Sequence, residues 1–145
     1  MTVADGGTFA EQVLMHAQVG AALLAPLMTA AGFHPPAVEV VRGSGGPAAV
    51  VTWRRSDGMT VEAHVRGSLG IVRYGWGDAA MQHQDYLRAR GRRGEYPGFS
   101  HLPSEAFGHL MSDLRGVAAD VLTLTASEFA VVAGEATSLP KPPLP

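Results

Sequence analysis

The chain has 145 residues but no cysteine, a single lysine (Lys141) and few aromatic residues, which make up 7% of the sequence. The absence of cysteine excludes disulfide bonds, thiolate catalysis and cysteine-ligated zinc, and it leaves the redox compartment open. Excess positive charge is also lacking, because 11 basic residues stand against 13 acidic residues and the formal net charge is −2. Such a balance does not attract polyanions, so we expect no nucleic acid among the partners.

Long apolar runs are missing as well. Pro26 and Gly32 interrupt the longest candidate, which falls short of the ~20 apolar residues that a membrane span needs. Residues 1–7 have no basic segment and no apolar core, so we expect no signal peptide, no membrane partner and a cytoplasmic location. The length fits one folded domain, predicted at residues 1–137, and the proline-rich residues 138–145 predict a disordered tail.

What the chain does contain is a regular alternation of apolar and polar residues over residues 48–76. This period of two predicts three antiparallel strands joined by two tight turns. A three-residue loop at residues 56–58 pairs Trp53 with Val61 and keeps the apolar side chains on one face. A two-residue turn there would place Trp53 opposite Glu62 and mix the two faces, so the sequence favours the longer loop.

The second turn follows from the same rule. A two-residue turn at residues 67–68 pairs Val61 with Tyr74 and Met59 with Trp76, so that both tryptophans face the core. A cross-strand pair of Glu62 and Arg73 then lies on the other face and stabilises the sheet by ~0.2–1 kcal/mol. That polar face is predicted to carry Thr52, Arg54, Thr60, Glu62, His64, Arg66, Ile71 and Arg73.

Helical patterns flank this sheet. The first runs from an N-cap at Thr8 to Gly32, and the others cover residues 78–90, 104–122 and 129–133; residues 37–42 predict one further strand. Asp113 in the long C-terminal helix is interpreted as a solvated surface residue. The sequence therefore predicts an α+β fold, with a four-stranded antiparallel β-meander, an N-terminal and a C-terminal long helix packed on one face, and the order α-β-β-β-β-α-α.

Acid–base chemistry has three candidates, His83, Tyr96 and His101, which lie in segments expected to fold over one end of the sheet. Tyr96 and Phe99 flank a Pro-Gly turn, and they are interpreted either as a cover for the core or as binding residues. A metal pair at His83 would need a second ligand four residues on, where the chain has leucine, so we expect no metal ion and no cofactor.

Two functions fit these residues. The first is a non-catalytic intracellular protein-binding module of the adaptor, chaperone or immunity-protein kind, which binds a protein partner or a second subunit in a homodimer. Its predicted binding residues are Arg54, Glu62, His64, Arg66, Ile71, Arg73, Trp76, Tyr96 and Phe99. The alternative is a small cofactor-free enzyme, a cyclase, isomerase or lyase from a GC-rich genome, which takes a small-molecule ligand and uses His83, His101 and Tyr96 as catalytic residues.

Overall fold

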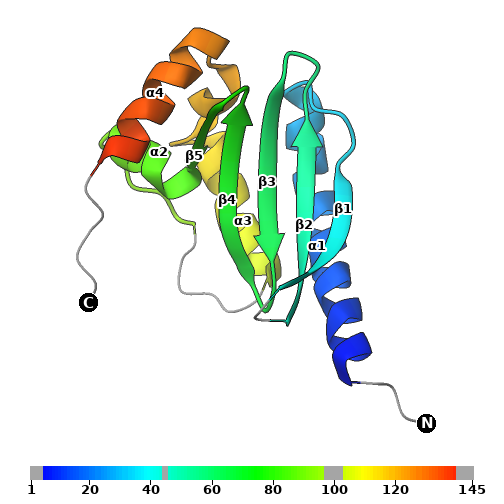
Figure 1. Cartoon of the computed structure of the whole chain (residues 1–145). Helices are drawn as coiled ribbons and strands as arrows, with labels where there is room; N and C mark the ends of the chain where they lie inside the picture. Colours follow the sequence, from blue (N-terminus) through cyan, green and yellow to red (C-terminus); the bar gives the residue numbers. More distant parts are fainter. Residues whose placement is uncertain (1–4, 44–45, 97–102, 140–145) are drawn as a thin grey trace.

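The computed structural model of this chain describes residues 5–43, 46–96 and 103–139 (Figure 1). The elements in chain order are α1 (Asp5–Ala30), β1 (Ala37–Gly43), β2 (Gly46–Arg54), β3 (Met59–Val65), β4 (Leu69–Trp76), β5 (Ala79–Gln82), α2 (His83–Ala89), α3 (Pro103–Arg115), the short 3₁₀ helix η1 (Ala119–Thr123) and α4 (Ala126–Ser138).

The five strands form one antiparallel sheet in sequence order, β1-β2-β3-β4-β5, and the helices pack against one of its faces (Figure 1). Helix α1 packs on β1, β2 and β3, whereas α3 packs on β4 and α4 packs on β4 and β5. The predicted α+β layout is confirmed. The prediction of four strands was wrong by one, because the structure adds β5.

The strand register agrees with the alternation of the sequence. Trp53 pairs with Val61, Val61 pairs with Tyr74, and Met59 pairs with Trp76. Trp53 is 1% exposed, so the three-residue loop after β2 does keep the apolar side chains of β2 and β3 on the core side. Near the second turn the register shifts by one between Ala63 and Val65, so the predicted two-residue turn was wrong there and a bulge takes its place.

The fifth strand replaces the start of a predicted helix. Gly77 has a φ of +60°, which glycine adopts without a steric penalty, and it turns the chain so that Ala79 pairs with Trp76 and Met81 with Tyr74. Met81 becomes buried on the core side, and α2 begins only at His83. A four-residue segment has little helix propensity of its own, and the pairing with β4 therefore decides its conformation.

Helix α1 begins at Asp5, so the predicted N-cap at Thr8 lies inside the helix instead. Residues 9–30 are long and apolar enough to cross a membrane by length and composition, although a third of that window is buried in the fold. The same helix is the largest helical contribution to the core. Gly20 sits where a Cβ would overlap the ring of Phe107, so glycine allows α1 and α3 to approach closely.

The C-terminal helices differ from their predicted bounds. The expected helix over residues 104–122 divides into α3 and η1, because the chain turns at Gly116 and the N–H of Ala118 bonds to the carbonyl of Asp113 at 2.7 Å. Helix α4 is longer than the predicted residues 129–133. It begins after Thr125, whose side chain forms a capping box with Glu128.

Candidate functional site

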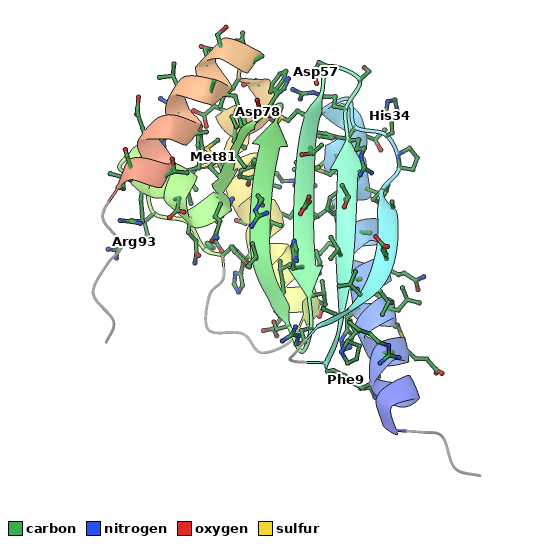
Figure 2. All side chains as sticks on the ribbon, viewed as in Figure 1. Phe9, His34, Asp57, Asp78, Met81 and Arg93 are labelled. Atoms are coloured by element: carbon green, nitrogen blue, oxygen red, sulfur yellow. The ribbon has the colours of Figure 1, made fainter. Side chains whose placement is uncertain are left out.

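The sheet has one surface that no described helix covers, and we call it the outer face. The side chains opposite the core on β1 to β5 form it (Figure 2). They lie in three cross-strand rows: Arg54, Thr60, Gly75 and Ala80; Ala37, Thr52, Glu62, Arg73 and Gln82; and Glu39, Val50 and His64. Six of the eight predicted outward residues lie in these rows, Ile71 lies in β4 two residues before Arg73, and Arg66 follows the end of β3.

Charge and apolar area are mixed on this outer face. Arg54, Arg66 and Arg73 are exposed, and within the described ranges none of the three makes an ion pair. Glu62 instead bonds to the Nε2 of His64 at 3.2 Å. Ile71, which precedes Arg73 by two residues in β4, keeps 41% of its surface exposed. Arginine is enriched at protein interfaces, and an exposed apolar side chain such as Ile71 gains free energy when a partner covers it.

A hollow of about 290 Å³ opens in the outer face over β3, β4 and β5. Its floor is shallow because Gly75 and Ala80 occupy adjacent outward positions. A Cβ at Gly75 would lie 2.7 Å from the Oγ1 of Thr60, so a side chain there would displace Thr60. Glu62 and Arg73 form one side of the hollow, and the rim carries Trp76 and Asp78. This volume is slightly below that of most small-molecule sites, which is ~300–1,000 Å³.

Trp76 is held at that rim by a cluster around Arg55, a residue that the sequence analysis did not select. The Nε of Arg55 donates to both carboxylate oxygens of Asp57, at 2.9 and 3.0 Å, and its Nη1 donates to the carbonyl of Leu122 at 2.7 Å. The Nε1 of Trp76 donates to the carbonyl of Asp57 at 3.0 Å. Figure 2 shows Asp57 and Asp78 at the same end of the sheet.

The cluster has electrostatic and aromatic components. The hydrogen bond from Arg55 lowers the pKa of Asp57 below its ordinary value. The guanidinium carbon of Arg55 also lies 5.1 Å from the ring centroid of Phe33 and 5.5 Å from that of Trp76. These contacts combine charge with ring faces, which is the geometry of a cation–π interaction. The turn between β4 and β5 is thereby tied to the loop after β2.

His83 lies in a buried polar network on the opposite, helix-covered side of the sheet. Its Nδ1 is 2.5 Å from the hydroxyl of Tyr74, and its Nε2 is 2.9 Å from the Oδ2 of Asp113. All three side chains are at most 2% exposed. Asp113 also accepts backbone N–H bonds from Glu95 at 2.6 Å and Tyr96 at 3.1 Å. The interpretation of Asp113 as a solvated surface residue was therefore wrong.

Proton positions in this network follow from the hydrogen bonds. An ionised Asp113 accepts from the Nε2–H of His83, and the free Nδ1 then accepts from the hydroxyl of Tyr74. Burial would raise the pKa of Asp113, but the bonds from His83 and from two backbone amides outweigh it and lower that pKa. Burial raises the pKa of the Tyr74 hydroxyl well above its ordinary value, so this group stays protonated.

The network has the chemical parts of an acid–base relay but no open side. His83 is 1% exposed, and both of its ring nitrogens are occupied by Tyr74 and Asp113. The ring of Tyr96 covers it edge-on, with 5.6 Å between the ring centroids. A substrate therefore reaches His83 only if Tyr96 is displaced. The arrangement serves to join β4, α2, α3 and the Glu95–Tyr96 segment inside the fold.

The remaining predicted catalytic and binding residues are Tyr96, Phe99 and His101. Tyr96 is 5% exposed, and burial raises the pKa of its hydroxyl to about 12, which fits its interpretation as a cover for the core. It also lines a surface hollow of about 310 Å³ that contains Arg88, Arg92 and Arg93. Arg92 is already paired with Asp120 at 2.8 Å. Phe99, His101 and residues 140–145 lie outside the described residues.

Metal binding finds no support in the residues that the structure describes, since no group of three or more His, Asp or Glu side chains is placed to hold an ion. Comparison with known proteins gives no match to any family model, curated protein or solved structure. The function must therefore be argued from the outer face itself.

Proposed function

We propose that this chain is a non-catalytic protein-binding module, and that its outer face takes an extended, partly acidic segment of another protein. The observation that carries the proposal is the exposure of Ile71 on the same face of β4 as Arg73, which has no ion-pair partner in the described part of the chain. An apolar side chain in such surroundings gains free energy when a partner covers it, at ~25 cal/mol per Å² of apolar area.

Charge complementarity supports the acidic character of the partner. Three arginines, Arg54, Arg66 and Arg73, contribute to the outer face or its margin, where the carboxylates of Glu39, Glu62 and Asp78 also lie. Glu62 already has a hydrogen-bond partner in His64. In the described residues these three guanidinium groups have no ion-pair partner, and arginine binds carboxylates in a bidentate geometry. A neutral or basic segment would leave these groups without compensation.

The hollow over β3 to β5 supports an anchoring role for one side chain of the partner. Its volume of about 290 Å³ suits a single large side chain better than a drug-sized ligand. Trp76 lines one end of the hollow, but its ring packs on Phe129 of α4, with 5.9 Å between the ring centroids, and its Nε1 bonds to the carbonyl of Asp57.

A comparison of surface variants tests this proposal. The wild-type chain and the variants Ile71→Asp, Arg73→Glu and Val131→Asp are immobilised and exposed to an extract of the source cells, and the captured proteins are identified by mass spectrometry. Val131 is the matched control, because it is an aliphatic residue with 62% exposure on α4, which packs on the opposite face of the sheet. We expect a partner that both the wild type and Val131→Asp retain and that the other two variants lose.

The purified partner then decides the chemistry of the contact. Calorimetric titration is expected to give an affinity that falls about tenfold or more with Ile71→Asp or Arg73→Glu and that weakens with added salt. Binding that is equally strong for Ile71→Asp, Arg73→Glu and the wild type would contradict the proposal. Turnover of a small molecule by the wild type that is lost in His83→Ala, with the variant still folded, would favour the enzyme alternative.

A further inference from the structure

The two edge strands of the sheet differ in length and in whether another element covers them. At one edge β5 has only four residues and α4 packs against it. At the other edge β1 has seven residues in regular register with β2, and Figure 1 shows no described helix or strand beyond it. Long, regular and uncovered edge strands readily pair with another strand, and natural proteins usually shorten, twist or cover them. The open edge of β1 is therefore a candidate interface.

Hydrogen bonds in the sheet reveal which backbone groups of β1 are free. The N–H of Arg55 bonds to the carbonyl of Met59 at 2.9 Å, so the odd-numbered residues of β2 bond to β3. The even-numbered residues of β2 consequently bond to β1, as the bond from the N–H of His34 to the carbonyl of Arg54 also indicates. Their partners in β1 are the odd-numbered residues, which include Glu39 and Val41.

Three residues of β1 therefore direct their backbone N–H and C=O groups away from the sheet, namely Val38, Val40 and Arg42. Pro47 agrees with this assignment, because it lies opposite Arg42 and has no N–H to offer across the pair. In the described part of the chain these six groups have no backbone partner outside the sheet. The side chains of Val40 and Val41 are 37% and 38% exposed, so apolar surface accompanies the free backbone groups.

We propose that β1 pairs antiparallel with β1 of a second copy of this chain, around a two-fold axis at Val40, to form a continuous ten-stranded sheet. A two-fold axis normal to the sheet keeps the helices of both copies on one side. Even-numbered residues of one β1 then lie opposite even-numbered residues of the other, and odd-numbered residues lie opposite odd-numbered ones. The free residues 38, 40 and 42 are spaced evenly about Val40. Only a register centred there satisfies all six free backbone groups of each copy.

The side chains of β1 are compatible with this register. Val40 lies opposite its own equivalent, Val38 lies opposite Arg42 of the second copy, and Glu39 lies opposite Val41 of the second copy. No two like charges are directly opposed, and the axial pair is β-branched, which cross-strand positions favour. The outer faces of the two copies also become one surface, because the axis does not exchange the faces of the sheet.

Charge substitutions at Val40 test the axis. The mass of the wild type is measured by light scattering after size-exclusion chromatography, and we expect twice the 15.2 kDa of one chain. Val40→Lys and Val40→Glu each place two like charges opposite one another, so each is expected to weaken the dimer about tenfold or more. An equimolar mixture of the two variants is expected to restore a dimer that contains one copy of each.

Val41 provides the matched control in the same strand. In the proposed register Val41→Lys gains a carboxylate neighbour, Glu39 of the second copy, whereas Val41→Glu places two carboxylates opposite one another. The first variant is therefore expected to strengthen the dimer and the second to weaken it. At Val40 both signs of charge weaken it.

A further variant addresses the backbone alone. Val40→Pro removes an N–H that points away from β2, so it leaves the internal pairs of the sheet intact and is expected to give a folded monomer. Circular dichroism and the urea midpoint check that each variant is folded. A monomeric wild type at concentrations up to the millimolar range would overturn the proposal. A dimer that Val40→Lys, Val40→Glu and Val40→Pro leave unchanged would also overturn it.

Discussion

The contact between α1 and α3 at Gly20 gives a prediction in which two effects of known size oppose each other. Gly20 lies inside α1, where replacement of glycine by alanine normally stabilises a helix by ~1 kcal/mol. In this fold, however, a Cβ at residue 20 would overlap three ring carbons of Phe107. That ring is fully buried, so it has no open direction in which to move. Packing and helix propensity therefore predict opposite signs for the change in the free energy of unfolding that Gly20→Ala causes.

The magnitude follows from the packing term. An extra methyl group in a well-packed core costs ~1–3 kcal/mol, and the overlap with three ring carbons places Gly20→Ala near the upper end. After the gain of ~1 kcal/mol in helix propensity, we expect a net loss of ~2 kcal/mol in the free energy of unfolding. For a chain of this size, such a loss lowers the melting temperature by ~6 °C. Urea unfolding followed by circular dichroism measures both quantities.

Two other helical glycines serve as matched controls. Gly108 in α3 and Gly134 in α4 have no atom within 4 Å of the position that a Cβ would take. Gly108→Ala and Gly134→Ala are therefore expected to stabilise the protein by ~0.5–1 kcal/mol each. If Gly20→Ala stabilised the protein as much as these two variants, the close approach of α1 and α3 would be refuted.

Three further predictions concern polar contacts. Arg55→Lys keeps the positive charge but loses the guanidinium group that bonds to Asp57 and Leu122. We expect the free energy of unfolding, measured in urea, to fall by ~2 kcal/mol and the pKa of Asp57, measured by NMR titration, to rise. An unchanged pKa would contradict the assigned contact. The lowered pKa of Asp113 stabilises the fold above the unfolded value of ~3.9, and this contribution disappears as the pH falls through the lower folded pKa. Asp113→Asn should therefore destabilise the protein near neutral pH and reduce the loss of stability as the pH falls below ~4, which unfolding curves at acidic pH measure. Thr125→Ala removes the N-cap of α4 and should cost ~1 kcal/mol, with Thr125→Ser as the variant that restores stability.

The sequence determined the central sheet because side-chain period and register are linked. A shift of one residue would have moved Trp53 from the core to the outer face, and only one loop length avoided that outcome. The pairs Trp53–Val61 and Val61–Tyr74 accordingly agree with the prediction. The clustering of Arg54, Glu62 and Arg73 on one surface followed from the same alternation. These features depend on neighbours within a hairpin, which local patterns contain.

The fold beyond the hairpins depended on contacts between distant segments. Residues 79–82 have no strong preference of their own, and their pairing with β4 made them a strand. Asp113 follows the pattern of an exposed helical residue, yet it meets His83, 30 positions earlier in the chain, in the interior. Arg55 likewise reaches the carbonyl of Leu122, 67 positions away.

Periodicity alone therefore determined which face of each strand is apolar, because that property repeats every two residues. It contains no record of which polar side chain meets which other one across the core, since such partners are selected by three-dimensional proximity and by the need to satisfy buried hydrogen-bonding groups. The tertiary structure alone decided that His83 is sealed inside and that the edge of β1 is open. The uncovered outer face combines both contributions, because alternation selects its side chains and the placement of the helices leaves them exposed.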